Sequence, residues 1–176
     1  VTALPTPGGG PATARGTISH KAIQLSIHWP GTPVSGHLVD RAVELLGDTD
    51  GSIADWLRNL ADYERAELRS WVVERVDRFL ECFPPLKANW RPVTEGRSRY
   101  PANGAITLHA KPDLTIGTAE GAMSRKAVID LKSGPSRAVH RDDLRFYALV
   151  ETLTRRTPPR VLVGYSLEAC RPETEE

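Results

Sequence analysis

Residues 126–134 read Lys-Ala-Val-Ile-Asp-Leu-Lys-Ser-Gly, and this stretch decides both the expected fold and the expected chemistry. Its apolar residues predict a strand over 126–131, and Gly134-Pro135 then breaks the chain. Side chains alternate between the two faces of a strand, so Asp130 and Lys132 project to the same side, about 7 Å apart along the chain. A carboxylate and an ammonium group are unusual among such apolar neighbours unless the protein uses them.

The flanking sequence predicts an α/β fold. Upstream, helical spacing of apolar residues predicts helices over 18–29, 36–46 and 53–80. Alternation and turn residues then predict strands over 90–100, 105–116 and 161–167, with a hairpin turn at 101–104 and a helix over 141–154. We therefore expect a mixed central sheet that carries the site at one edge, flanking helices, and an N-terminal helical layer.

Composition predicts one ordinary soluble domain. The chain has 176 residues, of which 40% are hydrophobic and 26% charged. Residues 1–14 are rich in Gly, Pro, Ala and Thr and are expected to be disordered, the domain spans 15–168, and 169–176 are expected to form a solvated acidic tail. The formal net charge is +1, which excludes a protein that coats nucleic acid through its overall charge, so any such contact needs a local patch.

Cysteine content and hydropathy bear on cofactors and location. Cys82 and Cys170 are the two cysteines, too few for a Cys₄ zinc site or an iron–sulfur cluster. Free thiols in a reducing compartment are the favoured interpretation, and a disulfide between them is the alternative. No apolar run is long enough to cross a bilayer and no secretory signal is seen, so we expect a cytoplasmic protein without a membrane partner.

A second acidic residue, Asp113, follows Lys111-Pro112 at the end of the preceding hairpin strand, which can bring it beside Asp130. Two converging carboxylates make a hard-oxygen site suited to Mg²⁺ or Mn²⁺. Such an ion polarises a phosphodiester and lowers the pKa of water, and Lys132 can orient that water and stabilise developing charge. Taken alone, the Asp-x-Lys pattern is more typical of a surface ion pair on an edge strand than of a metal site. The residues around it therefore decide between these two interpretations.

That context resembles the PD-(D/E)XK nuclease superfamily, in particular its RecB-like exonuclease branch. The matching segments are Pro112-Asp113, Asp130-Leu131-Lys132, the following helix with Tyr147, and Gly16 to His20, which matches an upstream Gly-x-x-x-His. The resemblance covers about 16–167. It implies a restriction-endonuclease-like core and metal-dependent hydrolysis of phosphodiester bonds, most of all in DNA, as an exonuclease or a related repair or defence nuclease.

The resemblance also implies residue roles. Asp113, Asp130 and Lys132 would be catalytic, and His20, Asp113, Asp130 and the carbonyl of Leu131 would hold Mg²⁺ or Mn²⁺. Tyr147 would hold the DNA. One departure is Asp143, which stands where the family helix usually has a Gln: a carboxylate only accepts hydrogen bonds, so it could pair with Lys132 or Arg145 instead.

Basic residues of the second half of the chain are expected to crowd around the proposed site and to contact nucleic acid there. Arg137 and Arg141 follow Lys132 and are the best candidates for phosphate contacts, with Arg145. A solvated mixed-charge surface is the alternative for the whole group (Arg125, Lys126, Arg137, Arg141, Arg145, Arg155, Arg156, Arg160). Glu95 is either a further ligand or a solvent-facing strand residue.

The expected partners are single- or double-stranded DNA and a helicase or other subunit of a repair or defence complex. The alternative function is a module that keeps this fold and binds nucleic acid or a partner without cutting.

Overall fold

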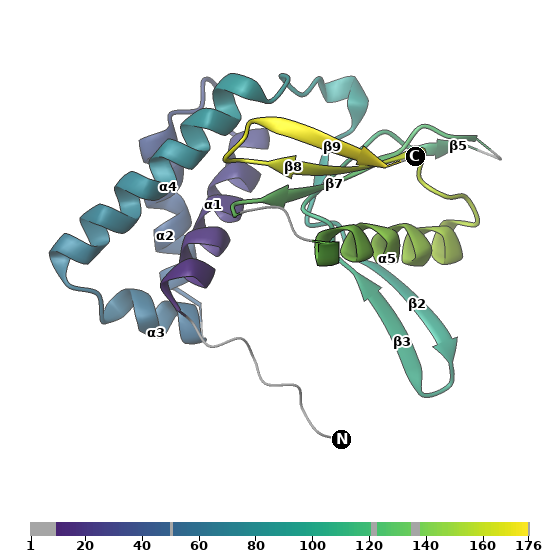
Figure 1. Cartoon of the computed structure of the whole chain (residues 1–176), viewed down its shortest axis with the longest axis horizontal. Coiled ribbons are helices and arrows are strands. Elements are labelled where there is room, and N and C mark those ends of the chain that lie inside the picture. Colours follow the sequence, from purple (N-terminus) through teal and green to yellow (C-terminus); the bar gives the residue numbers. More distant parts are fainter. Residues whose placement is uncertain (1–9, 50, 121–122, 135–137, 176) are drawn as a thin grey trace. The chain divides into compact units, whose positions relative to one another are not determined.

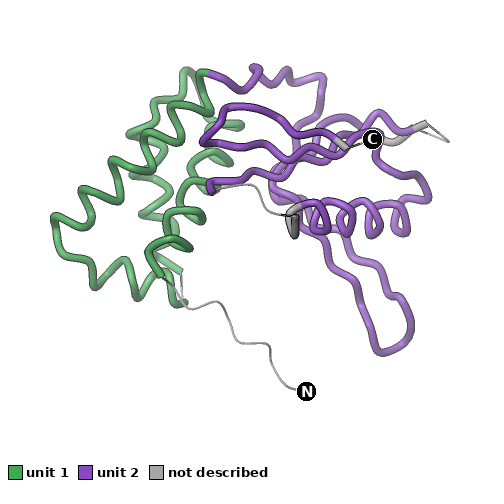
Figure 2. Tube along the Cα trace, viewed as in Figure 1, with its two compact units in different colours: residues 1–81 green, residues 82–176 purple. Residues whose placement is uncertain are grey.

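The computed structural model describes residues 10–49, 51–120, 123–134 and 138–175. The chain divides into two compact units, Val1–Glu81 and Cys82–Glu176, which Figure 2 colours separately. Each unit is described by itself below. None of the helices in the described ranges is both long and apolar enough to cross a membrane.

Unit 1 is helical, with α1 (Pro11–Ile27), α2 (Ser35–Gly47), α3 (Ser52–Arg58) and most of α4 (Asp62–Cys82). Helix α1 packs against α2 and buries Ala14, Ile18 and Ala22. It begins at Pro11, seven residues before the expected start at residue 18, because proline in the first helical turn has its φ preset for a helix and loses no hydrogen bond there. Residues 11–14, expected to be disordered, are therefore helical.

The single helix expected over 53–80 is wrong, because α3 and α4 are separate. The side-chain amide of Asn59 donates a hydrogen bond to the carbonyl of Asp55 at 2.8 Å, which satisfies the end of α3. The backbone N–H of Ala61 donates to Oε2 of Glu64 at 2.9 Å, which caps the start of α4. These two side-chain caps replace the backbone bonds that a continuous helix would have had.

Unit 2 contains a mixed five-stranded sheet, as the sequence predicts. Its strand order is β1 (Val93–Thr94), β4 (Leu114–Ile116), β7 (Ala127–Lys132), β8 (Val161–Ser166) and β9 (Arg171–Glu175). Strands β7 and β8 are parallel and are connected by α5 (Ala138–Arg155), while the other neighbours are antiparallel.

Strand β7 is the central strand, and its residues from Val128 to Leu131 are all buried. Burial of consecutive residues means that both faces are covered. The expectation that the site lies at one edge of the sheet is therefore corrected for Asp130 and Lys132: both are on the middle strand, near its C-terminal end.

Two expected strands are each interrupted. The strand expected over 90–100 is divided between β1 and β2 (Ser98–Asn103), because Glu95 adopts a left-handed backbone with φ 50°. The strand expected over 105–116 is divided between β3 (Ile106–Ala110) and β4, because Pro112 has no N–H to continue a ladder. Strands β2 and β3 form a two-stranded hairpin, as expected, and β5 (Ala119–Glu120) pairs with β6 (Met123–Ser124).

The C-terminal residues expected to form a solvated tail instead form β9, which pairs antiparallel with β8. Their composition fits an edge strand: Arg171, Glu173 and Glu175 carry charge, and Pro172 has no N–H to offer a further strand. Acidic residues and proline are typical both of solvated tails and of edge strands, so composition alone does not distinguish the two.

Gly117, at the end of β4, is required by its backbone. Its φ is +81°, and a Cβ there would lie 2.1 Å from the carbonyl oxygen of Arg125. We expect Gly117→Ala to lower the free energy of unfolding by about 2–4 kcal/mol, combining the cost of left-handed backbone with displacement of the neighbouring chain. Urea denaturation measures this. Gly104→Ala, with no atom within 4 Å of the new Cβ, is the control and should change stability by less than about 0.5 kcal/mol. Equal stabilities would contradict the prediction.

Candidate functional site

Strands β4 and β7 bring Asp113 to the end of β7 that carries Asp130. Leu114 pairs with Ile129 in the antiparallel register, so Asp113 lies one residue beyond this pair, level with Asp130. Carboxylate Oδ2 of Asp113 accepts a hydrogen bond from the backbone N–H of Leu131 at 2.7 Å. The Asp113 side chain is thus held against the residue between Asp130 and Lys132, which fixes the two carboxylates on neighbouring strands.

Asp130 and Lys132 project to the same face of β7, and Nζ of Lys132 forms an ion pair with Oδ2 of Asp130. The Asp130 side chain is only 6% exposed and that of Lys132 is 21% exposed. The alternative of a surface ion pair on an edge strand is therefore wrong. Transferring these two charges from water into the protein costs free energy, and their mutual attraction offsets only part of that cost.

Helix α5 adds a third carboxylate and a hydroxyl to the same face. Oδ2 of Asp143 lies 3.9 Å from Nζ of Lys132, one of the two pairings that the sequence left open. Arg145, the other partner that the sequence offered for Asp143, lies 3.6 Å from Asp142. Lys132 therefore lies between two carboxylates, one buried on the sheet and one half exposed on the helix.

Tyr147 follows Asp143 by one helical turn. Burial, followed by the negative charges of Asp130, Asp113 and Asp143, raises the pKa of Tyr147 to about 12. All three carboxylates are close enough to act on this hydroxyl, so they and Tyr147 form one cluster, called here the acidic cluster. Its tyrosine keeps its proton at neutral pH and can donate a hydrogen bond.

The predicted metal ligands divide between the units. His20 lies on α1 in unit 1 and is partly buried, whereas Asp113 and Asp130 belong to unit 2, so a ligand role for His20 stays a prediction. Leu131 supplies its N–H to Asp113, and the role of its carbonyl also stays a prediction. Among the His, Cys, Asp and Glu side chains that the structure describes, no group of three is arranged to hold a metal ion.

The arginines predicted to contact phosphate are Arg137, Arg141 and Arg145. Arg137 lies outside the described residues. Arg141 and Arg145 are exposed on α5. With 3.6 residues per turn, both lie about 160° around the helix from Asp143, and Arg141 and Arg145 lie about 120° and 160° from Tyr147. Contact between these two arginines and a phosphate therefore stays a prediction.

Two further basic residues, Lys126 and Arg155, have a structural role. Both pair with Oε1 of Glu151, at 2.6 and 3.6 Å, and Ser98 donates to its Oε2 at 2.8 Å. Burial raises the pKa of Glu151, but the bonds from Lys126 and Ser98 and the charges of Lys126 and Arg155 outweigh it, so the pKa lies below 4.5. Lys126 also precedes β7, at the opposite end from Lys132, so the expected crowding of both cations around the site is corrected.

Glu95 is neither on a strand nor fully exposed. Its N–H donates to the carbonyl of Asp113 at 3.0 Å, and its Oε1 lies 3.2 Å from Nζ of Lys111. It therefore supports the backbone of Asp113 directly. The sequence did not reveal this contact because it depends on the left-handed turn that separates β1 from β2.

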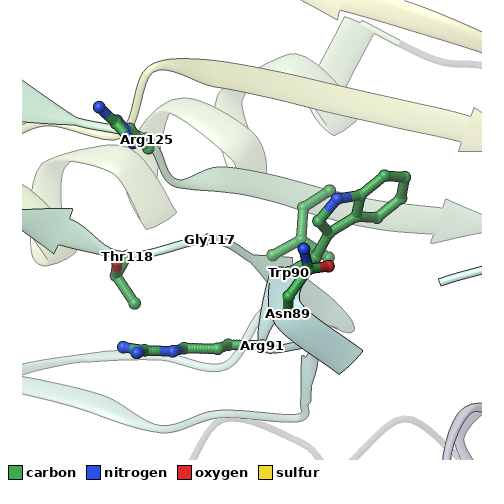
Figure 3. A pocket seen from close by; sticks show the side chains of 7 residues that line it. Asn89, Trp90, Arg91, Gly117, Thr118 and Arg125 are labelled. Carbon is green, nitrogen blue, oxygen red and sulfur yellow. The ribbon is translucent and has the colours of Figure 1, made fainter. Parts of the chain in front are cut away.

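A hollow of about 420 Å³ lies at the end of β4 away from Asp113. Figure 3 shows Arg91 and Arg125 approaching it from separate segments, with Gly117 and Thr118 between them in this view. The residues that line it are Asn89, Trp90, Arg91, Ile116, Gly117, Thr118 and Arg125. None of these is acidic, so this hollow does not compete with the acidic cluster as a metal site.

Comparison of the chain with protein-family models and with the curated proteins gives no match. The residues of unit 2 and their geometry are therefore the basis on which function is considered.

Proposed function

We propose that the protein is a metal-dependent nuclease that hydrolyses phosphodiester bonds, most of all in DNA. The observation that carries this is the buried Asp130 carboxylate paired with Lys132, with Asp113 held beside them on the neighbouring strand. Buried ionisable groups that converge with shifted pKa values are typical of functional sites. A structural ion pair alone would not call for two further carboxylates nearby.

The side chains of the cluster fit a divalent ion by their chemistry. Asp113 and Asp130 offer carboxylate oxygens from adjacent strands, the hard donors that Mg²⁺ and Mn²⁺ prefer. These two residues would hold the ion, with the Leu131 carbonyl as the further ligand of this unit that the family resemblance suggests. When bound, the ion would polarise the phosphodiester and lower the pKa of water.

Lys132 and Tyr147 would act on the substrate itself. The ammonium group of Lys132 is held on the same face as Asp130, where it would stabilise charge that develops on the phosphate oxygens. Tyr147, with its pKa raised to about 12, would keep its proton and donate a hydrogen bond to a phosphate oxygen. Asp143 would fix the position of Lys132 through their 3.9 Å contact.

The order of these parts along the chain supports the proposal. Asp113 precedes β4, Asp130 and Lys132 follow on β7, and α5 with Tyr147 leads to the parallel strand β8. The resemblance to the PD-(D/E)XK superfamily, and its RecB-like branch, requires this sequence of elements. A restriction-endonuclease-like core is therefore part of the proposal.

The proposal is tested by incubating labelled single- and double-stranded DNA with the full chain and Mg²⁺ or Mn²⁺. Cleavage is expected with either ion and none with EDTA. Asp113→Asn should reduce the rate to background. Asp142→Asn, at an exposed acid on α5 that pairs with Arg145, is the matched control and should cut normally. Absence of cleavage by the wild type with both ions would reject the nuclease.

The pH dependence tests the role of Tyr147. Burial is the largest cause of the raised pKa of Tyr147 and does not depend on a bound metal ion, so Tyr147 should contribute no titration between pH 7 and 10. We expect Tyr147→Phe to lower the cleavage rate about tenfold, which corresponds to the loss of one hydrogen bond to a charged group. The shape of the pH–rate profile should not change in this range. A limb near pH 10 that disappears in Tyr147→Phe would contradict this account.

A second candidate is a module that binds nucleic acid without cutting it. It is favoured by Asp143, which offers a carboxylate to Lys132 where the family usually has an amide. In that case the charge of Lys132 would be neutralised by the carboxylates of Asp130 and Asp143. The protein would then bind DNA with the same affinity with and without divalent ions. Measuring DNA binding in EDTA and in Mn²⁺ separates the two candidates.

A further inference from the structure

The hairpin of β2 and β3, with Arg97 before it and Lys111 after it, is called here the ribbon. Figure 1 shows the two strands extending from the region of the sheet past α5. Ser98 pairs with Ala110, Arg99 with His109 and Tyr100 with Leu108. Because side chains alternate along each strand, this register assigns the even-numbered and odd-numbered residues to opposite faces.

The even-numbered face of the ribbon is directed to the protein. Ala110 is buried, and Ser98, Tyr100 and Leu108 are partly buried. Both strands contact α5, and Ser98 donates to the buried Glu151 at 2.8 Å. Thr154 of α5 lies 3.5 Å from the carbonyl oxygen of Arg99. The ribbon is thus fixed to the helix that carries Asp143 and Tyr147.

The odd-numbered face is exposed and basic. Arg97, Arg99, His109 and Lys111 are all exposed, and Arg99 lies opposite His109 in the register. Arg97 precedes Ser98 and Lys111 follows Ala110, the last residue pair of the hairpin. The sequence from 96 to 112 contains no Asp or Glu. Of the two acids that flank this segment, Asp113 belongs to the acidic cluster and Glu95 pairs with Lys111 at 3.2 Å, which leaves the two arginines as the net charge of this face.

Such a face is unfavourable for the isolated protein. Arg97 and Arg99 place two exposed positive charges two residues apart, and these charges repel each other when nothing anionic covers them. The arrangement is explained if an anionic partner covers it. Lys111 is two residues before Asp113, so the basic face continues directly into the acidic cluster along the chain.

We propose that the basic face of the ribbon binds the phosphate backbone of double-stranded DNA and directs it to the acidic cluster. This rests on the proposed nuclease function. Proteins that bind single strands stack bases on aromatic side chains, but the one aromatic ring of the ribbon outside His109 is Tyr100, on the face toward α5. A rigid ribbon that offers cations alone is suited to phosphate contacts on a duplex.

The test measures binding of a fluorescent DNA duplex to the full chain by anisotropy, in EDTA, over a range of salt concentrations. Each phosphate contact contributes about 0.9 to the slope of log affinity against log salt. The double variant Arg97→Ala with Arg99→Ala is expected to reduce that slope by about 2 and to weaken binding equally for unrelated sequences. Arg171→Ala, at an exposed arginine on β9, is the matched control and should leave both quantities unchanged.

The outcomes separate this proposal from the nuclease. If the double variant keeps the wild-type slope, or if only single-stranded binding weakens, the ribbon is not a duplex-binding surface, whatever the cleavage assay gives. If the slope falls as expected and the wild type never cuts with Mg²⁺ or Mn²⁺, the ribbon is supported and the nuclease is rejected. Circular dichroism of both variants establishes that they fold, since the substituted side chains are exposed.

Discussion

Lys132→Ala is expected to lower the rate of DNA cleavage by about 10²–10³-fold, the usual cost of removing one group that stabilises charge in a transition state. The ion pair with Asp130 places the Lys132 ammonium beside the carboxylate that would hold the metal. Removing that positive charge also removes a competitor for the metal. The variant should therefore bind Mn²⁺ as tightly as the wild type or more tightly, which calorimetric titration can measure alongside the rate.

Two further variants sharpen this prediction. Lys132→Arg keeps the charge but replaces a compact ammonium with a planar guanidinium, so it should recover only part of the rate. Lys87→Ala, at an exposed lysine of the same unit, should cut like the wild type. Wild-type cleavage by Lys132→Ala would contradict the role assigned to the ammonium, and loss of Mn²⁺ binding would mean that Lys132 supports the site structurally.

Asp130→Asn is expected to abolish both Mn²⁺ binding and cleavage. Replacement of groups that merely orient a metal ligand costs about 10–100-fold in affinity, and loss of a ligand itself should cost more. The side chain is 6% exposed and pairs with Lys132, so removing its charge should also destabilise the fold, by up to about 3 kcal/mol. Calorimetry and cleavage must be measured well below the melting temperature of the variant.

Asp113→Asn is the comparison that separates metal loss from unfolding. The amide oxygen of an asparagine can still accept the hydrogen bond from the Leu131 N–H, so the fold should be nearly unchanged. We expect metal binding and cleavage to be lost all the same. If Asp113→Asn and Asp130→Asn both retained Mn²⁺ binding, the metal would bind elsewhere and the site would be misassigned.

The sequence predicted the parts of the fold that depend on local pattern. Alternation and apolar content predicted β7, α5 and β8 within a few residues, because each is a regular element with a glycine or proline close to one of its ends. The approach of Asp113 to the Asp130 strand was also expected, since a hairpin strand followed by β7 brings them together. The pairing of Lys132 with Asp143 was one of two alternatives that the sequence left open.

Features that depend on strand order or on side-chain caps were not predicted from the sequence. The central position of β7 follows from a sheet order that no local pattern encodes. The division of the long helix depends on caps by Asn59 and Glu64, which periodicity does not register. Strand β9 forms because β8 presents an edge to it.

The positions of the basic side chains were also not predictable from local sequence patterns. Lys126 was expected near the site but lies at the other end of β7, paired with Glu151, because sequence proximity to Asp130 does not give the direction along a strand. The basic face of the ribbon was not predicted, although the sequence over 96–112 contains no Asp or Glu. Which face Arg97 and Arg99 occupy could be decided only once the register with β3 was known.

The most direct test of the account is anomalous diffraction from a crystal soaked in Mn²⁺. We expect one strong peak about 2.1 Å from a carboxylate oxygen of Asp113 and about 2.1 Å from a carboxylate oxygen of Asp130. The Lys132 ammonium should no longer be in direct contact with Oδ2 of Asp130. A peak that touches neither carboxylate, or the absence of any peak while Lys132 still pairs with Asp130, would contradict it.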